Sequence, residues 1–271
     1  MSQTPHDFLV VGVQKGGTTA LHHYLDLHPD ILLPRAKELH FFDDERRWKG
    51  LHCLSGIGFY NCLAERDPAR LAWLAARHSS GEAVKGEITP IYLYWQPCLA
   101  RIQRYHRAIR LVVLLRNPIE RAISHYRMER ARGNESLPLL SALLRERERL
   151  ASQPLAQHRI FSYVHRGFYS LQLERLWRFF PREQTLVCLS EELEGARTET
   201  LNRICRFLGV SPIYDATLAP FLTPRHRSTL PLEPSQEALT LLARIFAPEI
   251  RRLERLLERS LDHWLRAPLS Q

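Results

Sequence analysis

The chain has 271 residues, of which 45% are hydrophobic, and this is enough for a folded core; its formal net charge is +9. The positive charge predicts an anionic partner such as a nucleotide, an acidic glycan, a nucleic acid or a membrane surface. No apolar run approaches the roughly 18 residues of a membrane span, and the five cysteines, an odd number without a C-x-x-C pair, argue against a disulfide framework and a zinc site.

We expect a cytoplasmic protein without a membrane span. The apolar run near the N-terminus follows no basic stretch, so it predicts the first strand of the fold and not a signal peptide. No internal repeat or low-complexity tract divides the chain, which predicts a single domain over residues 1–271. The sequence leaves the oligomeric state open.

Short apolar segments alternate with helical patterns along the chain. Strands are predicted at residues 8–13, 82–88, 110–115 and 185–189, and helices at 18–27, 118–132, 168–180, 198–208 and 235–261. This alternation is typical of an α/β fold with a P-loop-type, mostly parallel sheet that helices flank on both faces. The charged segment 138–160 is of helical type and predicts an insertion near the site, and the proline-rich segment 222–234 predicts a basic loop.

The first strand leads directly into a glycine-rich turn and a helix. The turn reads Gln14-Lys-Gly-Gly-Thr-Thr19. Glycines let the backbone approach a phosphate, free N–H groups point at it, and the helix dipole favours its negative charge. A glycine turn without a ligand is the alternative. We predict a phosphate cradle that consists of Lys15, Gly16, Gly17, Thr18 and Thr19.

The turn differs from the Walker A loop of nucleotide triphosphatases. Gly12 and Gly17 have the Walker A spacing, but Thr18 stands at the lysine position and the lysine comes earlier. A triphosphatase also needs an acid after a later strand to help hold Mg²⁺, whereas the best later strand is followed by Arg116. An arginine there repels Mg²⁺ and attracts a second phosphate. The pattern predicts a nucleotide with two separated anionic groups and no metal.

The segment Lys37-Glu-Leu-His-Phe-Phe-Asp43 carries a candidate acid–base pair. Glu38 and His40 alternate, so in an extended strand their side chains share one face, and Phe41 and Phe42 anchor the segment in the core. An ionised glutamate can accept a proton from an approaching hydroxyl group. On this segment alone, a surface loop that merely packs its aromatic side chains is an equal alternative.

A second anion site is predicted where the strand at 110–115 ends. Arg116 leaves this strand, and Ser124 lies about two turns along the helix that follows. Arginine is suited to bidentate contact with a phosphate, and a serine hydroxyl adds one more hydrogen bond.

Together these motifs resemble those of the sulfotransferases that use 3′-phosphoadenosine 5′-phosphosulfate (PAPS), in particular the branch of the heparan sulfate sulfotransferases and their bacterial relatives. The resemblance extends from Phe8 to Leu208, with a weaker match at 224–230. It implies an enzyme with PAPS as its sulfate donor and a hydroxylated acceptor, and with neither a metal nor a nucleic acid partner.

The resemblance also implies roles for individual residues. Lys15 contacts the phosphosulfate and stabilises the departing phosphate, Glu38 acts as the base, and His40 assists it. The implied donor site consists of Lys15, Gly16, Gly17, Thr18 and Thr19 around the 5′-phosphate, Arg116 and Ser124 around the 3′-phosphate, and Arg225, His226 and Arg227 in a basic loop over the nucleotide. For this basic loop, a solvated loop without a ligand is the alternative.

One position departs from the heparan sulfate enzymes, which carry a second lysine in a Glu-Lys-Thr-Pro segment. Here the segment reads Glu87-Ile-Thr-Pro90, so Ile88 replaces the lysine. The chain therefore uses one catalytic lysine or recruits a cation elsewhere. We expect a bacterial-type enzyme that acts on a small molecule, a lipid or a glycan, and the identity of the acceptor stays open.

Two other functions remain as alternatives. A P-loop kinase would transfer phosphate from ATP with Mg²⁺ and needs a differently placed lysine. A basic polyanion-binding module with a vestigial loop would bind DNA or RNA with a strong dependence on salt, and it leaves the pairing of Glu38 with His40 unexplained.

Overall fold

The computed structural model describes residues 6–34, 36–50, 83–221 and 234–266. The chain forms two compact units. The first comprises residues 1–115 and 176–223, and the second comprises residues 116–175 and 224–271. The single domain expected from the sequence stays a prediction.

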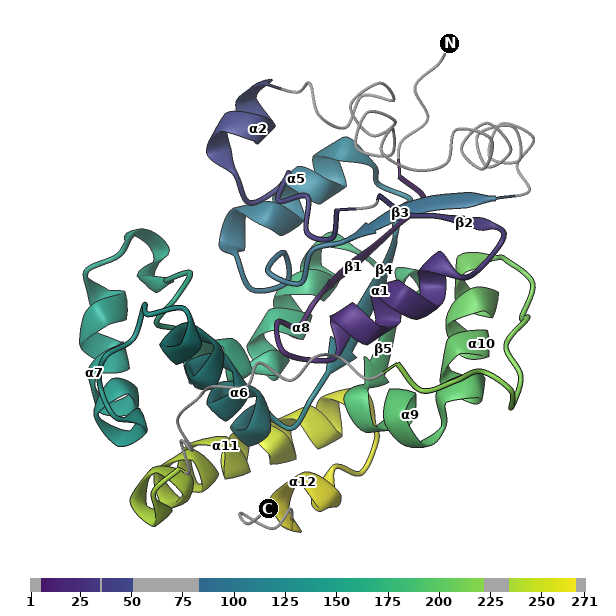
Figure 1. The fold of residues 1–271 in the computed structure, drawn as a ribbon. Helices are drawn as coiled ribbons and strands as arrows, with labels where there is room; N and C mark the ends of the chain where they lie inside the picture. Colours follow the sequence, from purple (N-terminus) through teal and green to yellow (C-terminus); the bar gives the residue numbers. More distant parts are fainter. Residues whose placement is uncertain (1–5, 35, 51–82, 222–233, 267–271) are drawn as a thin grey trace. The chain divides into compact units, whose positions relative to one another are not determined.

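In the described part of the chain, five strands form one sheet within the first unit (Figure 1). Their order is β2-β3-β1-β4-β5, and every neighbouring pair is parallel. The expected α/β fold is therefore confirmed. The strands are β1 (Phe8–Gly12), β2 (Ile31–Leu32), β3 (Val84–Ile88), β4 (Arg110–Leu115) and β5 (Thr185–Leu189).

Strand β1 lies at the centre of the sheet, and its side chains are apolar on both faces. All its residues are buried, which is typical of a parallel sheet that is covered on both sides. Phe8 lies opposite Gly86 of β3, and a Cβ atom at Gly86 would lie 2.4 Å from the Phe8 ring. The glycine therefore lets the aromatic ring pack across the neighbouring strand.

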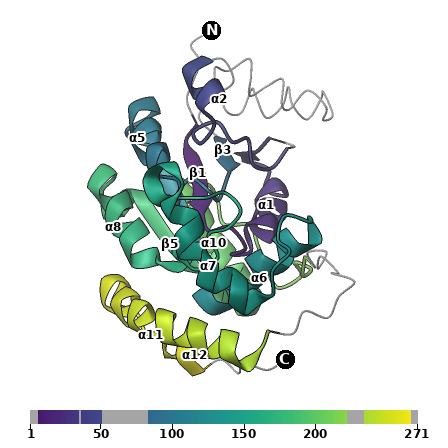
Figure 2. The same cartoon turned by 90° about the vertical axis from the view of Figure 1, so that its left-hand side faces the viewer.

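Helices cover both faces of this sheet. On one face, α1 (Thr18–Asp26), α9 (Ser190–Gly195) and α10 (Arg197–Leu208) pack against apolar side chains of β1, β4 and β5. Figure 2 shows α1 and α5 (Gln96–Tyr105) on opposite sides of β1. The first unit also contains α2 (Glu45–Gly50) and the short 3-10 helix η3 (Arg182–Gln184).

The second unit is helical in the part of the chain that the structure describes. Asn117 caps α6 by accepting a hydrogen bond from the N–H group of Ile119 at 3.0 Å, and its amide donates to the Trp264 carbonyl. A Cβ atom at Gly167 would lie 2.5 Å from the Phe246 ring, so this glycine permits close packing of η2 on α11. The elements are α6 (Pro118–Ala131), α7 (Leu139–Ala151), η1 (Pro154–Ala156), η2 (His165–Gly167), α11 (Gln236–Leu257) and α12 (Asp262–Arg266), while α8 (Tyr169–Phe179) begins here and ends in the first unit.

Most of the predicted elements are present with small shifts of their ends. The helix predicted at 235–261 is an exception: α11 ends at Leu257, Glu258 takes a left-handed conformation with a φ of 51°, and α12 follows. The charged segment 138–160 contains α7 and η1, which confirms its helical type. The sequence patterns do not predict α2, α5, α9 or β2. Of the loop predicted at 222–234, only Pro234 lies within the described residues.

Candidate active site

The glycine turn after β1 forms a closely packed cradle. The N–H group of Val13 donates to the Leu114 carbonyl at 2.9 Å, and the N–H group of Gly16 donates to the Val13 carbonyl at 3.0 Å. The Ser190 hydroxyl donates to the Gly16 carbonyl at 2.6 Å. A Cβ atom at Gly16 would lie 2.6 Å from the Leu114 carbonyl oxygen, so this position requires glycine. Gly17 follows with a φ of 89° and forms the N-cap of α1.

The start of α1 is suited to an anion. Its N-cap, Gly17, offers no side chain to the first N–H groups of the helix, and the first turn contains no acidic residue. Thr18 is buried and Thr19 is exposed, while Lys15 is half-buried with a φ of 68°. The N–H groups of a first helical turn, the helix dipole and a nearby lysine together attract a phosphate. The start of α1 is therefore a candidate anion site.

The acid–base loop, which we define as residues 37–43, is not the extended strand that the sequence predicts. Glu38 and His40 have left-handed backbone conformations, with φ of 65° and 54°. Their side chains therefore do not share a face through strand alternation, yet Nε2 of His40 lies 3.6 Å from Oε2 of Glu38. Phe41 and Phe42 are buried, as expected. A turn brings the two polar side chains together, and its aromatic end is held in the core.

Two more side chains of the acid–base loop contact this pair. Nζ of Lys37 lies 2.5 Å from Oε1 of Glu38, and the Asp43 carboxylate lies 3.0 Å from Nδ1 of His40. Because a carboxylate only accepts hydrogen bonds, Nδ1 of His40 carries its proton toward Asp43, and Nε2 faces Glu38. The Asp43 side chain is buried, whereas the Glu38 and His40 side chains are 33% and 39% exposed. The Glu38 carboxylate is therefore accessible to a hydroxyl group from solvent.

The acid–base loop and the glycine cradle lie at the same edge of the sheet. The N–H group of Glu38 donates to the carbonyl of Ile88, the last residue of β3, at 3.1 Å. Strand β3 pairs in parallel with β1, which leads into the cradle at Gly12. Open α/β sheets bind their ligands at the carboxyl ends of their strands.

The second predicted anion site belongs to the other unit. Nε and Nη2 of Arg116 donate to Oε2 of Glu120 at 3.0 and 2.9 Å, and the Tyr169 hydroxyl donates to the Arg116 carbonyl. The Arg116 and Glu120 side chains are 34% and 48% exposed, so this ion pair is a weak competitor for a phosphate. Ser124 is half-buried on α6. Arg225, His226 and Arg227 lie outside the described residues.

Sequence reasoning missed two groups that support Glu38 and His40, namely Asp43 within the acid–base loop and Glu87 outside it. Asp43 follows His40 by three residues, a spacing that a turn brings into contact, and this is a signal that the sequence carries. Glu87 has no such signal, because its contact with Leu39 joins residues 48 positions apart.

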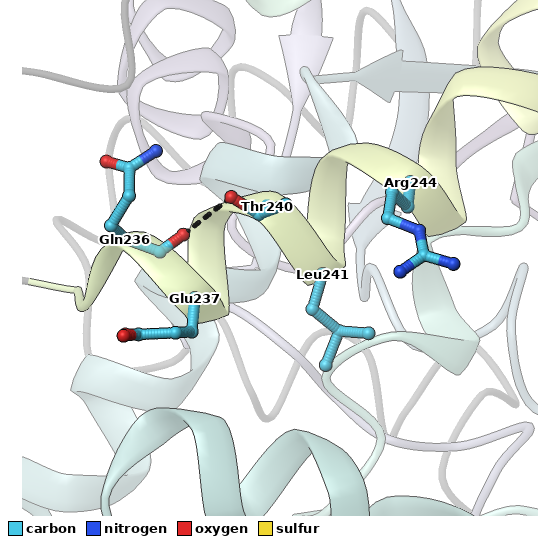
Figure 3. Close-up of a pocket in the computed structure, with 5 residues that line it drawn as sticks. All are labelled: Gln236, Glu237, Thr240, Leu241 and Arg244. Carbon is cyan, nitrogen blue, oxygen red and sulfur yellow. Dashed lines mark hydrogen bonds between the residues drawn. The ribbon is translucent and has the colours of Figure 1, made fainter.

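One hollow among the described residues lies away from the predicted site. It has a volume of about 290 Å³, and all its lining residues come from α11 (Figure 3), so it is an open helix surface. The lining residues are Gln236, Glu237, Thr240, Leu241 and Arg244.

Among the described residues, no three His, Cys, Asp or Glu side chains are grouped to hold a metal ion. No helix within those same residues is both long and apolar enough to cross a bilayer. The expected cytoplasmic location stays a prediction.

A comparison with protein families matches residues 5–218 to the sulfotransferase domain. The chain belongs to the sulfotransferase domain family. The match includes the glycine cradle, the acid–base loop and the segment from Arg116 to Ser124, so the resemblance that the motifs indicate is confirmed. Sulfotransferases of this family are enzymes that use PAPS.

Curated relatives and solved structures agree with this membership. Two mouse relatives, heparan sulfate glucosamine 3-O-sulfotransferases 3B1 and 3A1, are 31% identical over 209 residues and 32% identical over 205 residues. Each alignment covers 76% of this chain and 46% of the relative, so the chain spans about half the length of these relatives. The crystal structure of a sulfotransferase from Alicyclobacillus acidocaldarius is 28% identical with a TM-score of 0.71, covering 96% of this chain and 99% of that chain. Mouse sulfotransferase SULT7A1, in a complex with PAP, shares the fold with a TM-score of 0.52 at 15% identity, covering 93% of this chain and 88% of that chain.

Proposed function

We propose that this chain transfers a sulfuryl group from PAPS to the hydroxyl group of an acceptor. The supporting observation is that the glycine cradle after β1 and the backbone of Glu38, whose N–H group donates to the last residue of β3, lie at the carboxyl edge of two neighbouring parallel strands. Sulfuryl transfer requires both kinds of group, since the donor is an anion and the acceptor must lose a proton. PAPS supplies the sulfuryl group and leaves as adenosine 3′,5′-bisphosphate.

The donor is assigned to the cradle and to the arginine that follows β4. The cradle has N–H groups without a side-chain cap, a lysine, and no competing acid in the first turn of α1, which supports its role toward the 5′-phosphosulfate. The ion pair between Arg116 and Glu120 is partly exposed and therefore weak, so a 3′-phosphate can compete for the guanidinium group. The assignments are Lys15, Gly16, Gly17, Thr18 and Thr19 to the 5′ end, Arg116 and Ser124 to the 3′-phosphate, and Arg225 and Arg227 to the nucleotide on the resemblance alone.

Glu38 is the base in this proposal. Its carboxylate takes the proton of the acceptor hydroxyl while the hydroxyl oxygen bonds to sulfur and the bond between sulfur and the phosphate oxygen breaks. His40 orients the Glu38 carboxylate, and Asp43 holds the imidazole of His40. Lys15 and the N–H groups of the cradle stabilise the charge that develops on the departing phosphate oxygen, the role that Mg²⁺ has in kinases.

The acceptor is proposed to be a hydroxylated small molecule, lipid or glycan. By their names, the mouse relatives act on glucosamine in heparan sulfate. In this chain Ile88, which lies beside the backbone of Glu38, stands where the resemblance to the heparan sulfate branch implies a lysine. Lys37 is a cation that contacts the Glu38 carboxylate. We therefore assign the chain to sulfuryl transfer without assigning it to heparan sulfate.

Calorimetry and mass spectrometry test the proposal. We expect adenosine 3′,5′-bisphosphate to bind in the absence of Mg²⁺, and ATP with Mg²⁺ to bind far more weakly. A panel of hydroxylated acceptors incubated with labelled PAPS should yield a product that has gained one sulfuryl group. Tight binding of ATP–Mg²⁺ with phosphate transfer would instead indicate a kinase, and salt-sensitive binding of DNA or RNA without transfer would indicate a polyanion-binding module.

A further inference from the structure

A buried carboxyl group lies beneath the acid–base loop and takes no direct part in the proposed reaction. Glu87 is fully buried near the end of β3. Its Oε1 accepts a hydrogen bond from the Tyr92 hydroxyl at 2.6 Å, and its Oε2 accepts one from the Thr89 hydroxyl at 2.8 Å. Burying a carboxylate costs free energy unless its oxygens accept hydrogen bonds. The Tyr92 and Thr89 hydroxyl groups offset that cost here.

The same cluster is tied to the backbone of the acid–base loop. Oε2 of Glu87 also accepts from the N–H group of Leu39 at 3.4 Å, and the Tyr92 hydroxyl oxygen accepts from the N–H group of Phe41 at 2.9 Å. These two backbone groups lie on either side of His40. The buried pair of Glu87 and Tyr92 therefore fixes the backbone on both sides of His40, the residue that contacts the proposed base.

We propose that Glu87 and Tyr92 are positioning residues that hold the acid–base loop in the conformation that orients Glu38 and His40 for proton transfer. This inference rests on the proposed function. Neither side chain reaches the acceptor, because both are fully buried.

The backbone of the acid–base loop needs such support. Glu38 and His40 both have positive φ, and a left-handed conformation costs a residue with a side chain about 1–3 kcal/mol unless its surroundings impose it. The loop has neither helix nor strand pairing to impose it. Besides the Glu87–Tyr92 ties, the guanidinium group of Arg47 donates to the Leu39 carbonyl, and that of Arg101 donates to the Phe42 carbonyl at 2.9 Å.

The Tyr92 hydroxyl is the link that a single substitution can remove. Burial and the neighbouring Glu87 carboxyl raise the pKa of Tyr92. The hydroxyl group therefore stays protonated and donates a hydrogen bond to Glu87. Its oxygen remains available for the N–H group of Phe41. Phenylalanine keeps the ring and loses both hydrogen bonds, so Tyr92→Phe releases the loop while it leaves the packing in place.

The test compares Tyr92→Phe with Tyr105→Phe. Tyr105 is also largely buried, and its hydroxyl is bonded to His6 rather than to the acid–base loop. We expect Tyr92→Phe to lower kcat by roughly tenfold to a hundredfold, since small misplacements of a reacting group have effects of that size. The affinity for adenosine 3′,5′-bisphosphate should stay unchanged in calorimetry, and Tyr105→Phe should keep the wild-type kcat. Equal kcat values for wild type and Tyr92→Phe would overturn the positioning role.

Hydrogen exchange provides a readout that does not depend on turnover. In the wild-type chain we expect slow exchange of the Leu39 and Phe41 amides, and in Tyr92→Phe a faster exchange of Phe41. Fast exchange of both amides in the wild-type chain would overturn the proposal even if the variants fail to fold. If only Tyr92→Phe fails to fold, Glu87→Gln takes its place with the same expected loss of kcat and faster exchange of Leu39.

The two proposals fail in different ways. A wild-type chain that transfers no sulfuryl group to any acceptor contradicts the proposed function. An active wild-type chain together with an equally active Tyr92→Phe variant contradicts only the positioning role of Glu87 and Tyr92.

Discussion

Nζ of Lys37 lies 2.5 Å from Oε1 of Glu38, so the proposed base is paired with a cation supplied by its own neighbour in the chain. The two side chains are 20% and 33% exposed. Partly exposed ion pairs of this kind contribute about 1 kcal/mol or less to stability. The contact therefore matters for the orientation of the carboxylate more than for the fold.

Lys37→Met is expected to separate these two effects. The free energy of unfolding should change by less than about 1 kcal/mol, while kcat falls because the Glu38 carboxylate loses the cation that contacts its Oε1. Chemical denaturation measures the first quantity and steady-state kinetics the second. A Lys37→Met variant with unaltered kcat would show that His40 alone orients the base.

Substitutions of Lys15 and Glu38 are predicted to have different effects on turnover and on nucleotide affinity. Lys15→Ala should lower turnover by roughly a hundredfold or more, because it removes a donor to the departing phosphate oxygen. Glu38→Gln should slow turnover and leave the affinity for adenosine 3′,5′-bisphosphate largely intact, since Glu38 is not assigned to the nucleotide. Calorimetry and kinetics on the two variants check this contrast. Near-wild-type activity of Glu38→Gln would remove it from the role of base.

The glycine cradle makes a prediction about packing. At Gly16 a Cβ atom would lie 2.6 Å from a backbone carbonyl oxygen of Leu114, which cannot easily move, so Gly16→Ala should cost about 1–3 kcal/mol of stability and weaken binding of adenosine 3′,5′-bisphosphate. Gly195→Ala is the matched control, because a Cβ there meets no atom within 4 Å. Thermal denaturation of both variants is the measurement, and equal melting temperatures would contradict the close packing of the cradle.

Two buried carboxyl groups predict how stability depends on pH. Burial raises the pKa of Glu87 and of Glu146 to about 7, above the ordinary value of 4.5. Between these values the folded chain holds protons that the unfolded chain has lost, so the stabilisation is fully present below about pH 4.5 and is lost as the pH rises through about 7. Glu87 faces Tyr92 and the Asp43 carboxylate, and Glu146 faces Arg121.

The free energy of unfolding, measured by denaturation from about pH 5 to about pH 8, should therefore fall because of these two groups. Glu146→Gln removes one of them and should flatten the slope, although it also costs stability at every pH because the carboxylate accepts from the N–H groups of Val164 and His165. An identical slope in the wild-type chain and the variant would show that Glu146 does not titrate in this range.

The sheet and the glycine cradle are predictable from the sequence because their signals are local. Strands β4 and β5 are continuous apolar runs, and the turn at Gly16 and Gly17 follows β1 directly. Strand β2 has only two residues, too few for any periodic pattern. Helix α5 begins with a proline in its first turn, and a proline in a sequence is as readily interpreted as a break.

The acid–base loop shows what a local pattern cannot supply. Alternation of Glu38 and His40 predicts that the two side chains lie close together, and they do, but a left-handed turn and not a strand brings them together. The turn depends on hydrogen bonds that Glu87 and Tyr92 accept from backbone N–H groups of the loop, 48 and 51 residues away in the sequence. Such contacts exist only after the sheet has assembled.

The acid–base loop joins an exposed carboxylate to a pair of buried aromatic rings, and this matters for exchanging active-site segments between relatives. The Phe42 ring lies 5.3 Å from that of Tyr92 and 5.4 Å from that of Tyr105. A chimaera that receives only the loop acquires the base without the buried rings and hydrogen-bond acceptors that hold the loop in place. Transferring the chemistry of this chain to a relative therefore requires Glu87, Tyr92 and the aromatic ring at Tyr105 together with the loop, although none of them is adjacent to it in the sequence.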